Sequence, residues 1–140
     1  MNRVLGIDYG DSKVGFAVND ELNILATPLA TLFYKGDKDM LFAEIDKYVT
    51  KYDIKVFVVG MPLNMNNTKG ERVAKTEQFI ASLKEKYINI SIKTVDERLT
   101  TRNSNNIMNQ MNIKSAKKKK IEDTMAAISI LQLYIDMNNK

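Results

Sequence analysis

With 140 residues and a formal net charge of +4, this chain is long enough to bury one hydrophobic core but too short for two. It contains no cysteine and no histidine, which excludes disulfide bonds, thiolate or imidazole metal sites, and catalysis by a cysteine nucleophile or a histidine base. The apolar runs are far shorter than a membrane span and no export signal opens the chain, so we expect a cytoplasmic protein with a single domain over residues 1–140.

The first part of the chain predicts a β-hairpin followed by a third strand. Apolar residues alternate with small or polar ones over residues 4–9 and again over residues 14–18, with a short turn between them. Asp8 lies on the face of the first strand opposite to the large apolar side chains. A further extended segment, residues 24–33, contains Pro28, which is typical of an edge strand.

The middle of the chain predicts helices that alternate with strands. Asp37 can cap a helix whose apolar residues recur at helical spacing as far as Tyr52. Residues 55–60 form an apolar run, which is typical of a central parallel strand buried on both faces. Thr68 and Glu71 have the spacing of a capping box, which predicts the start of a second helix.

The last third predicts one more strand and two helices. Residues 90–95 form the strand, a weakly patterned helix follows Thr101, and a strongly apolar helix covers residues 121–137. The order of elements predicts an α/β fold with a mixed sheet, in which strands 1–3 are antiparallel, the later strands are parallel, and helices cover both faces.

Positive charge is concentrated in residues 98–120, which contain seven basic residues and no acid. The basic residues are Arg98, Arg102, Lys114, Lys117, Lys118, Lys119 and Lys120. Such a segment fits a nucleic-acid contact, but it equally fits a solvated lysine-rich loop. Both interpretations stay open on charge alone.

Four motifs together resemble the YqgF (RuvX) family. They are GIDYG at residues 6–10, VGMPLN at 59–64, DERLTT at 96–101 and DTMAA at 123–127. The resemblance covers nearly the whole chain and implies an RNase H-like fold, related to the RuvC Holliday-junction resolvases, and a nuclease that processes precursor 16S rRNA. Lys13 stands where the family often has Arg, which keeps the charge but loses the bidentate fork suited to phosphate.

Asp8, Glu97 and Asp123 are the candidate catalytic residues, and each also has a purely structural explanation. Asp8 lies in a segment with the composition of a hairpin turn. Glu97 could pair with Arg98, and Asp123 could stabilise the first turn of the last helix without any catalytic role. The resemblance places a metal carboxylate at Glu97 and matches Asp123. Gly6, on the same face as Asp8, is expected to leave an opening beside it.

The same three acids are the candidate metal ligands. Carboxylates in a chain without cysteine or histidine favour Mg²⁺ or Mn²⁺. In a two-metal hydrolase the ions lie about 3.5–4 Å apart, where one activates water and the other stabilises the departing oxygen. Because the phosphate supplies further oxygen ligands, we expect the ions to bind tightly only together with substrate.

Further polar residues are expected to contact the nucleic-acid backbone, which positions a substrate without reading its sequence. The basic candidates are Lys13, Arg98, Lys117, Lys118, Lys119 and Lys120. Asn64 and Thr100 follow strand ends, and the resemblance suggests that they orient a phosphate or a water.

The expected function is that of a metal-dependent endonuclease acting on structured nucleic acid, with precursor 16S rRNA as substrate and pre-ribosomal particles as partners. One alternative is a Holliday junction resolvase that acts as a dimer on branched DNA. Another is a non-catalytic nucleic-acid-binding assembly factor. A phosphotransferase of the actin and sugar-kinase type is disfavoured by length, because a pair of such domains is needed to clamp ATP. The expected state is a monomer or weak homodimer without membrane contact.

Overall fold

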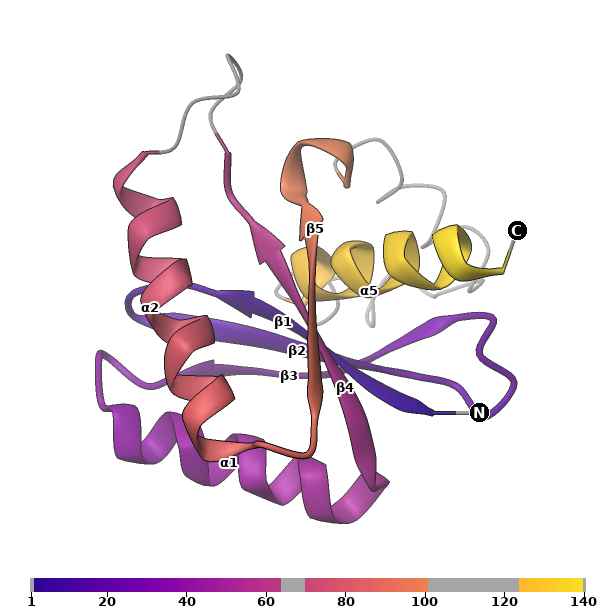
Figure 1. Cartoon of the computed structure of the whole chain (residues 1–140), viewed down its shortest axis with the longest axis horizontal. Coiled ribbons are helices and arrows are strands. Elements are labelled where there is room, and N and C mark those ends of the chain that lie inside the picture. The colour runs from indigo at the N-terminus through magenta and orange to yellow at the C-terminus, as the bar shows by residue number, and fades with distance from the viewer. Residues whose placement is uncertain (1, 64–69, 101–123, 140) are drawn as a thin grey trace, which may run out of the picture.

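The computed structural model describes residues 2–63, 70–100 and 124–139, and within them the chain forms a five-stranded mixed sheet in the order β3-β2-β1-β4-β5 (Figure 1). β1 pairs antiparallel with β2 and β2 with β3, whereas β4 runs parallel to both β1 and β5. The predicted mixed sheet is therefore confirmed. The strands are β1 Arg3–Tyr9, β2 Lys13–Asn19, β3 Ala26–Phe33, β4 Ile54–Met61 and β5 Ser91–Asp96, and the helices are α1 Lys38–Tyr52, α2 Glu71–Lys86, the 3₁₀ helix η1 Glu97–Leu99, and α5 Met125–Asn138.

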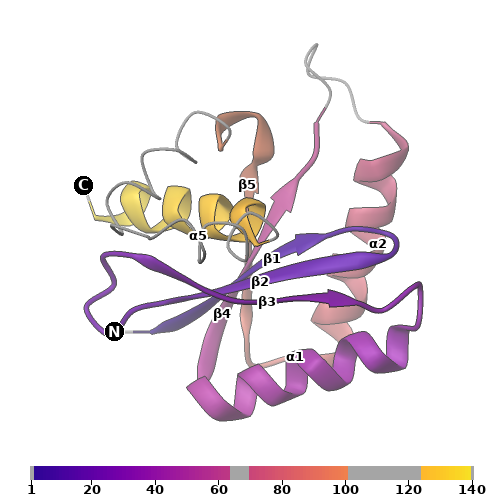
Figure 2. The ribbon, with the colours of Figure 1, turned by 180° about the vertical axis from the view of Figure 1, so that it is seen from behind.

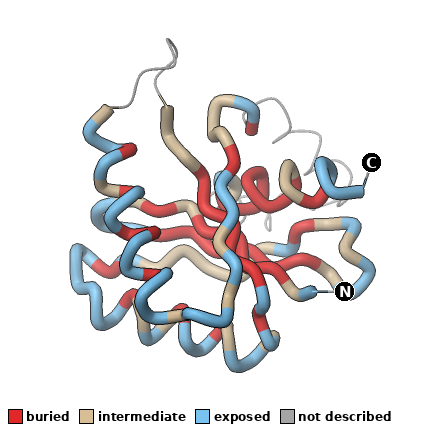
Figure 3. The backbone as a smooth tube through the Cα atoms, viewed as in Figure 1, coloured by how far each residue is buried: buried red, intermediate tan, exposed pale blue. Residues whose placement is uncertain are grey.

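Helices cover both faces of the sheet, as the sequence predicted (Figure 1 and Figure 2). α1 and α2 pack on the face that carries Leu5 and Ile7, and α5 packs on the face that carries Val4 and Ala17. The buried residues accordingly run through the middle of the molecule along the strands (Figure 3). None of the helices in the three described ranges has the length and apolar character needed to cross a bilayer.

β4 is the central parallel strand that its apolar run predicts. Phe57 and Val59 belong to the core under α1 and α2, and Val56 and Val58 belong to the core under α5. Because successive side chains point to opposite faces, a strand covered on both sides requires a continuous apolar run.

α1 begins and ends as its sequence dictates. The Asp37 side chain caps the helix by accepting a hydrogen bond from the Met40 amide at 3.2 Å, and Asp53 ends it in a left-handed conformation with φ of 53°. β3 is an edge strand, as Pro28 predicts, and Pro28 pairs with Ala17 beside a shift in the β2–β3 register.

Two predicted helix starts are wrong. α2 begins at Glu71 with Gly70 as its N-cap, so the helix does not use the predicted capping box, and Thr68 lies outside the described residues. Gly serves at an N-cap without a side-chain hydrogen bond, and the acidic Glu71 favours the helix N-terminus instead. α5 begins at Met125 rather than Ile121, with no acid in its first turn, and the helix predicted after Thr101 falls in residues that the structure does not describe.

α5 lies unusually close to β1. A Cβ atom on Gly6 would lie 2.8 Å from the Leu131 Cβ and 3.2 Å from the Ala127 carbonyl oxygen, so only glycine permits this approach. The opening expected beside Gly6 is therefore absent, because α5 fills it. The Gln132 side chain fixes the helix further by binding the Ala26 amide and the Ile24 carbonyl, both at 2.9 Å.

Candidate active site

Asp8 and Glu97 meet at one edge of the sheet. β1, β4 and β5 are parallel, so their carboxyl ends lie together, where α/β sheets usually place their ligands. Asp8 precedes the last residue of β1, and Glu97 follows directly after β5. Their carboxyl groups share a hydrogen bond. Two of the three predicted acids are thus brought together from distant parts of the chain.

Gly60 provides the route by which Glu97 reaches Asp8. β4 lies between β1 and β5, so the Glu97 side chain has to cross it. A Cβ atom on Gly60 would lie 2.6 Å from the Glu97 Oε1 and 2.4 Å from the Ile130 Cδ1. The sequence predicted Gly60 only as the end of the apolar run and as part of a family motif. The available signal was a glycine at the end of a buried strand, which often marks close approach of another group.

A tight turn after β5 orients Glu97. The Asp96 carboxylate accepts hydrogen bonds from the Arg98 amide at 3.0 Å and from the Arg98 guanidinium at 2.6 Å from Nη2. The Thr100 hydroxyl, which is buried, donates to the Glu97 carbonyl at 2.7 Å. In this turn Arg98 forms an ion pair with Asp96, the neighbour of Glu97. The hydrogen bond from Thr100 to the Glu97 backbone favours a positioning role for Thr100.

The two acids have raised pKa values. Burial raises the pKa of Glu97 to about 7, helped by the negative charge of Asp8 and by their shared hydrogen bond. Burial also raises the pKa of Asp8, although the hydrogen bond from Glu97 acts in the opposite direction. Because the two carboxyl groups are in contact, they titrate as a coupled pair that holds a proton to a higher pH than an ordinary acid does.

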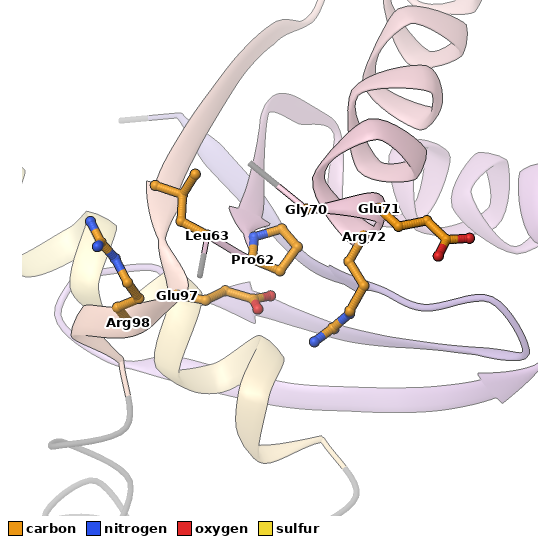
Figure 4. Close-up of a pocket in the computed structure, with 7 residues that line it drawn as sticks. All are labelled: Pro62, Leu63, Gly70, Glu71, Arg72, Glu97 and Arg98. Carbon is orange, nitrogen blue, oxygen red and sulfur yellow. The ribbon is translucent and has the colours of Figure 1, made fainter. Parts of the chain in front are cut away.

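A pocket of about 320 Å³ opens beside Glu97 and is lined by Arg72 of α2 as well as by Arg98 (Figure 4). Arg72 and Glu97 extend into the same space in this view. The positive charge of Arg72 lowers the pKa of both Asp8 and Glu97, although burial outweighs it. Sequence reasoning missed Arg72. Its signal was a cation in the first turn of a helix, where the helix dipole disfavours positive charge.

The remaining predicted residues divide into described and undescribed ones. Lys13 begins β2, and its positive charge acts to lower the pKa of Asp8, so it lies near the acid pair. Within the described ranges no group of three or more acidic side chains could hold a metal ion. Outside those ranges lie Asn64, Lys117, Lys118, Lys119, Lys120 and Asp123.

The two sequence comparisons agree on one family. The RuvX family profile, described as Holliday junction resolvase, matches residues 2–137. A protein of Acetivibrio thermocellus named "Putative pre-16S rRNA nuclease" is 43% identical over 138 residues, covering 99% of this chain and 98% of that one. A protein of the same name from Clostridium kluyveri is 41% identical over 138 residues, covering 99% of each chain.

The solved structure of T. thermophilus RuvC in complex with a Holliday junction substrate has a TM-score of 0.66 and covers 100% of this chain and 98% of that one. A second structure of Thermus thermophilus RuvC has a TM-score of 0.61. At 12% identity these similarities show the fold alone, which is RNase H-like. By its sequence over nearly its whole length, and with the fold that the motifs implied, the chain belongs to the RuvX (YqgF) family.

Proposed function

We propose that this protein is a metal-dependent endonuclease that hydrolyses phosphodiester bonds in structured nucleic acid, and that its substrate is precursor 16S rRNA. The observation that carries the proposal is the hydrogen-bonded pair of Asp8 and Glu97 at the carboxyl edge of the sheet. The names of the relatives from Acetivibrio thermocellus and Clostridium kluyveri support the rRNA substrate. Such a substrate would place the protein in the cytoplasm, as a single catalytic domain.

The acid pair has the chemistry of a site for a hard divalent cation. Two half-buried carboxyl groups with raised pKa values lie in contact, and their mutual repulsion would be relieved by Mg²⁺ or Mn²⁺. We assign Asp8 and Glu97 as ligands. We add Asp123, because the helix that follows it packs on β1 at Gly6, two residues before Asp8. A pair of such ions, when bound with substrate, supplies positive charge for the phosphate and for the attacking water.

The residues around the pair would hold the phosphate in place. Arg72 would donate to its non-bridging oxygens, since a guanidinium binds phosphate in a bidentate fork. Lys13 would add a point charge from the other side of Asp8. Thr100 would act through the backbone of Glu97, to which it is hydrogen-bonded. Backbone contacts further along the nucleic acid are predicted for Asn64, Arg98, Lys117, Lys118, Lys119 and Lys120.

The proposal is tested by changing each acid to its amide. We expect Asp8→Asn and Glu97→Gln to abolish Mg²⁺- or Mn²⁺-dependent cleavage of a precursor 16S rRNA transcript. The matched control is Asp53→Asn, which changes an exposed acid in a left-handed position that Asn tolerates. Full cleavage by purified Asp8→Asn or Glu97→Gln protein would refute the assignment.

Arg72 has its own test. Losing one fixed donor to a developing charge costs about 100-fold in rate or more. We therefore expect Arg72→Gln to lower kcat/KM strongly and Arg72→Lys to restore only part of it, since lysine lacks the fork. Equal activity of the Lys variant and the native protein would show that Arg72 acts only through its charge.

Junction resolution is a second candidate, favoured by the description of the matching family. A resolvase would cut a synthetic four-way DNA junction at two symmetric positions and act as a dimer. Cleavage of the rRNA transcript but not of the junction, by a monomer in sedimentation, would exclude it. Binding of either substrate without cleavage, at any metal concentration, would instead favour a non-catalytic assembly factor.

A further inference from the structure

A second pocket, of about 350 Å³, lies between the end of β1, the start of α1 and α2. We call it the Lys38 pocket. Tyr9 forms part of its wall and is the neighbour of Asp8, so the two side chains point to opposite faces of the same strand. The pocket is therefore separate from the space beside Glu97, but it opens at the same edge of the sheet.

Lys38 is held at this pocket by aromatic groups. Its ammonium group hydrogen-bonds the Tyr9 hydroxyl and lies 4.8 Å from the centre of the Tyr9 ring and 5.9 Å from that of Tyr34. Tyr9 in turn stacks on Phe79, with ring centres 4.3 Å apart. Among the described residues, no acid forms an ion pair with Lys38. The pocket thus presents a positively charged group that no acid in the described part of the chain pairs with.

A smaller pocket of about 70 Å³ shares lining residues with both the Lys38 pocket and the pocket beside Glu97. It shares Arg72 with the pocket beside Glu97, and it shares Asp11 and Lys75 with the Lys38 pocket. Three cations, Arg72, Lys75 and Lys38, therefore follow one another from the acid pair past the β1–β2 turn. Two acids on this path pair with the Lys75 ammonium group, Asp11 at 3.0 Å and Glu71 at 3.6 Å.

We propose that the Lys38 pocket holds a nucleotide of the substrate strand next to the cleaved bond, with its phosphate against Lys38 and Lys75. This inference rests on the proposed nuclease function and adds a substrate contact to it. Cations positioned along a groove follow a phosphate backbone, and half-buried Phe42 offers an aromatic surface to a base or sugar. A strand is preferred to a free nucleotide because neighbouring pockets share lining residues all the way from the Lys38 pocket to the pocket beside Glu97.

The test compares binding of a fluorescein-labelled 20-nucleotide single-stranded RNA by full-length variants, measured by anisotropy without divalent metal. Each lost phosphate contact lowers the slope of log affinity against log salt by about 0.7 for a single strand. We expect Lys38→Gln to weaken binding about three- to tenfold near 0.1 M salt with that change of slope, and Lys38→Arg to restore it. The matched control is Lys55→Gln, because Lys55 is half-exposed near the start of β4, at the opposite end of the sheet.

A variant that is expected to strengthen RNA binding shows whether the other variants act through charge or through damage to the fold. Asp11→Asn would remove the nearer of the two acids paired with Lys75 and leave Glu71, whose carboxylate lies 3.6 Å from the same ammonium group, so we expect RNA binding that is tighter by up to about twofold. Lysine acetylation read by mass spectrometry should also show protection of Lys38 and Lys75, but not of Lys55, when RNA is bound.

Unchanged affinity and salt slope in Lys38→Gln would overturn the pocket assignment, and would leave the nuclease proposal standing if Asp8→Asn abolishes cleavage. Weaker binding by Lys38→Gln together with full cleavage by Asp8→Asn would instead refute the catalytic assignment alone. If AMP displaced the labelled RNA at the same concentration as unlabelled RNA does, the pocket would be a site for free nucleotides. That result would overturn the strand proposal.

Discussion

Asp96 and Glu97 are neighbours in the chain, yet their carboxyl groups lie in opposite electrostatic surroundings. Asp96 is paired with Arg98, which holds the pKa of Asp96 below its usual value. Glu97 is half-buried against Asp8, and its pKa is raised to about 7. One acid is neutralised by a cation of its own turn, whereas the other is placed next to a second acid.

The difference separates a structural acid from a candidate catalytic one. A carboxylate with a cationic partner stabilises the fold modestly, because both charges are satisfied where they lie. Two carboxyl groups in contact reduce stability whenever both are ionised, so such a pair is typical of sites that bind a cation or move protons. Each of the following variants changes only one of the two acids, Glu97 or Asp96, or its surroundings.

The largest effect on cleavage is expected from Gly60→Ala. This change fills the space through which the Glu97 side chain reaches Asp8, but it leaves the Asp96–Arg98 turn in place. The added Cβ would lie 2.6 Å from the Glu97 Oε1 and 2.4 Å from the Ile130 Cδ1. We expect cleavage to fall by about 100-fold or more, since small displacements of catalytic groups are costly. Urea denaturation should show a loss of about 1–3 kcal/mol in unfolding free energy.

A second change separates these two effects. Ile130→Val, combined with Gly60→Ala, removes the Cδ1 atom and should restore stability but not activity, because the contact with Glu97 persists. Recovery of full activity in the double variant would mean that Glu97 does not need to cross β4 at Gly60.

An intermediate effect, with a clear pH dependence, is expected from Glu97→Gln measured with chelator. The folded-state pKa of Glu97 is raised from 4.5 to about 7, so the folded protein binds this proton more tightly than the unfolded chain. The contribution of Glu97 protonation to the stability of the folded state is fully present below pH 4.5 and is lost as the pH rises through 7. Relative to the native protein, Glu97→Gln should gain about 1–2 kcal/mol between pH 5 and pH 8, allowing for partial solvent exposure.

The metal provides the control for that measurement. Millimolar Mg²⁺ should reduce the advantage of Glu97→Gln at pH 8, since only the native protein has both carboxylates to bind the ion. A stability difference that does not change between pH 5 and pH 8 would contradict the raised pKa of Glu97.

The smallest effect is expected from Asp96→Asn, and it has the opposite sign. Arg98 lowers the folded-state pKa of Asp96, so the pair contributes stability above the ordinary pKa near 4 and loses it as the pH falls through the lower value. We expect Asp96→Asn to lose at most about 1 kcal/mol at pH 7 in urea denaturation, as is usual for an ion pair near the surface. An increase in stability at pH 7 would show that the two acids do not differ as described.

Much of this arrangement could be predicted from local patterns. The Asp37 cap and the apolar run of β4 depend on neighbouring residues alone, and both are confirmed. The meeting of Asp8 with Glu97 also follows from sequence, because parallel strands place their carboxyl ends at the same edge. The roles of these acids as ligands stay predictions, together with that of Asp123.

The features that sequence reasoning missed depend on contacts between distant elements. Arg72 was overlooked because the capping box predicted an earlier start for α2, which hid its place in the first turn. Gly6 was expected to leave space because α5, apolar on nearly every side, does not reveal which strand it covers. The importance of Gly60 depends on Ile130 and Glu97 together, and no local pattern joins those residues.

The contact of α5 with Gly6 and Gly60 also makes the titration of the acid pair dependent on a helix that is distant from Asp8 in the chain. Closing a contact between the first strand and the last helix spans nearly the whole sequence, and such non-local contacts form late in folding. Until α5 docks, water has access to this face of β1 and β4. In that state Asp8 and Glu97 would be less buried, so we expect docking of the helix to contribute to the raised pKa values of both acids.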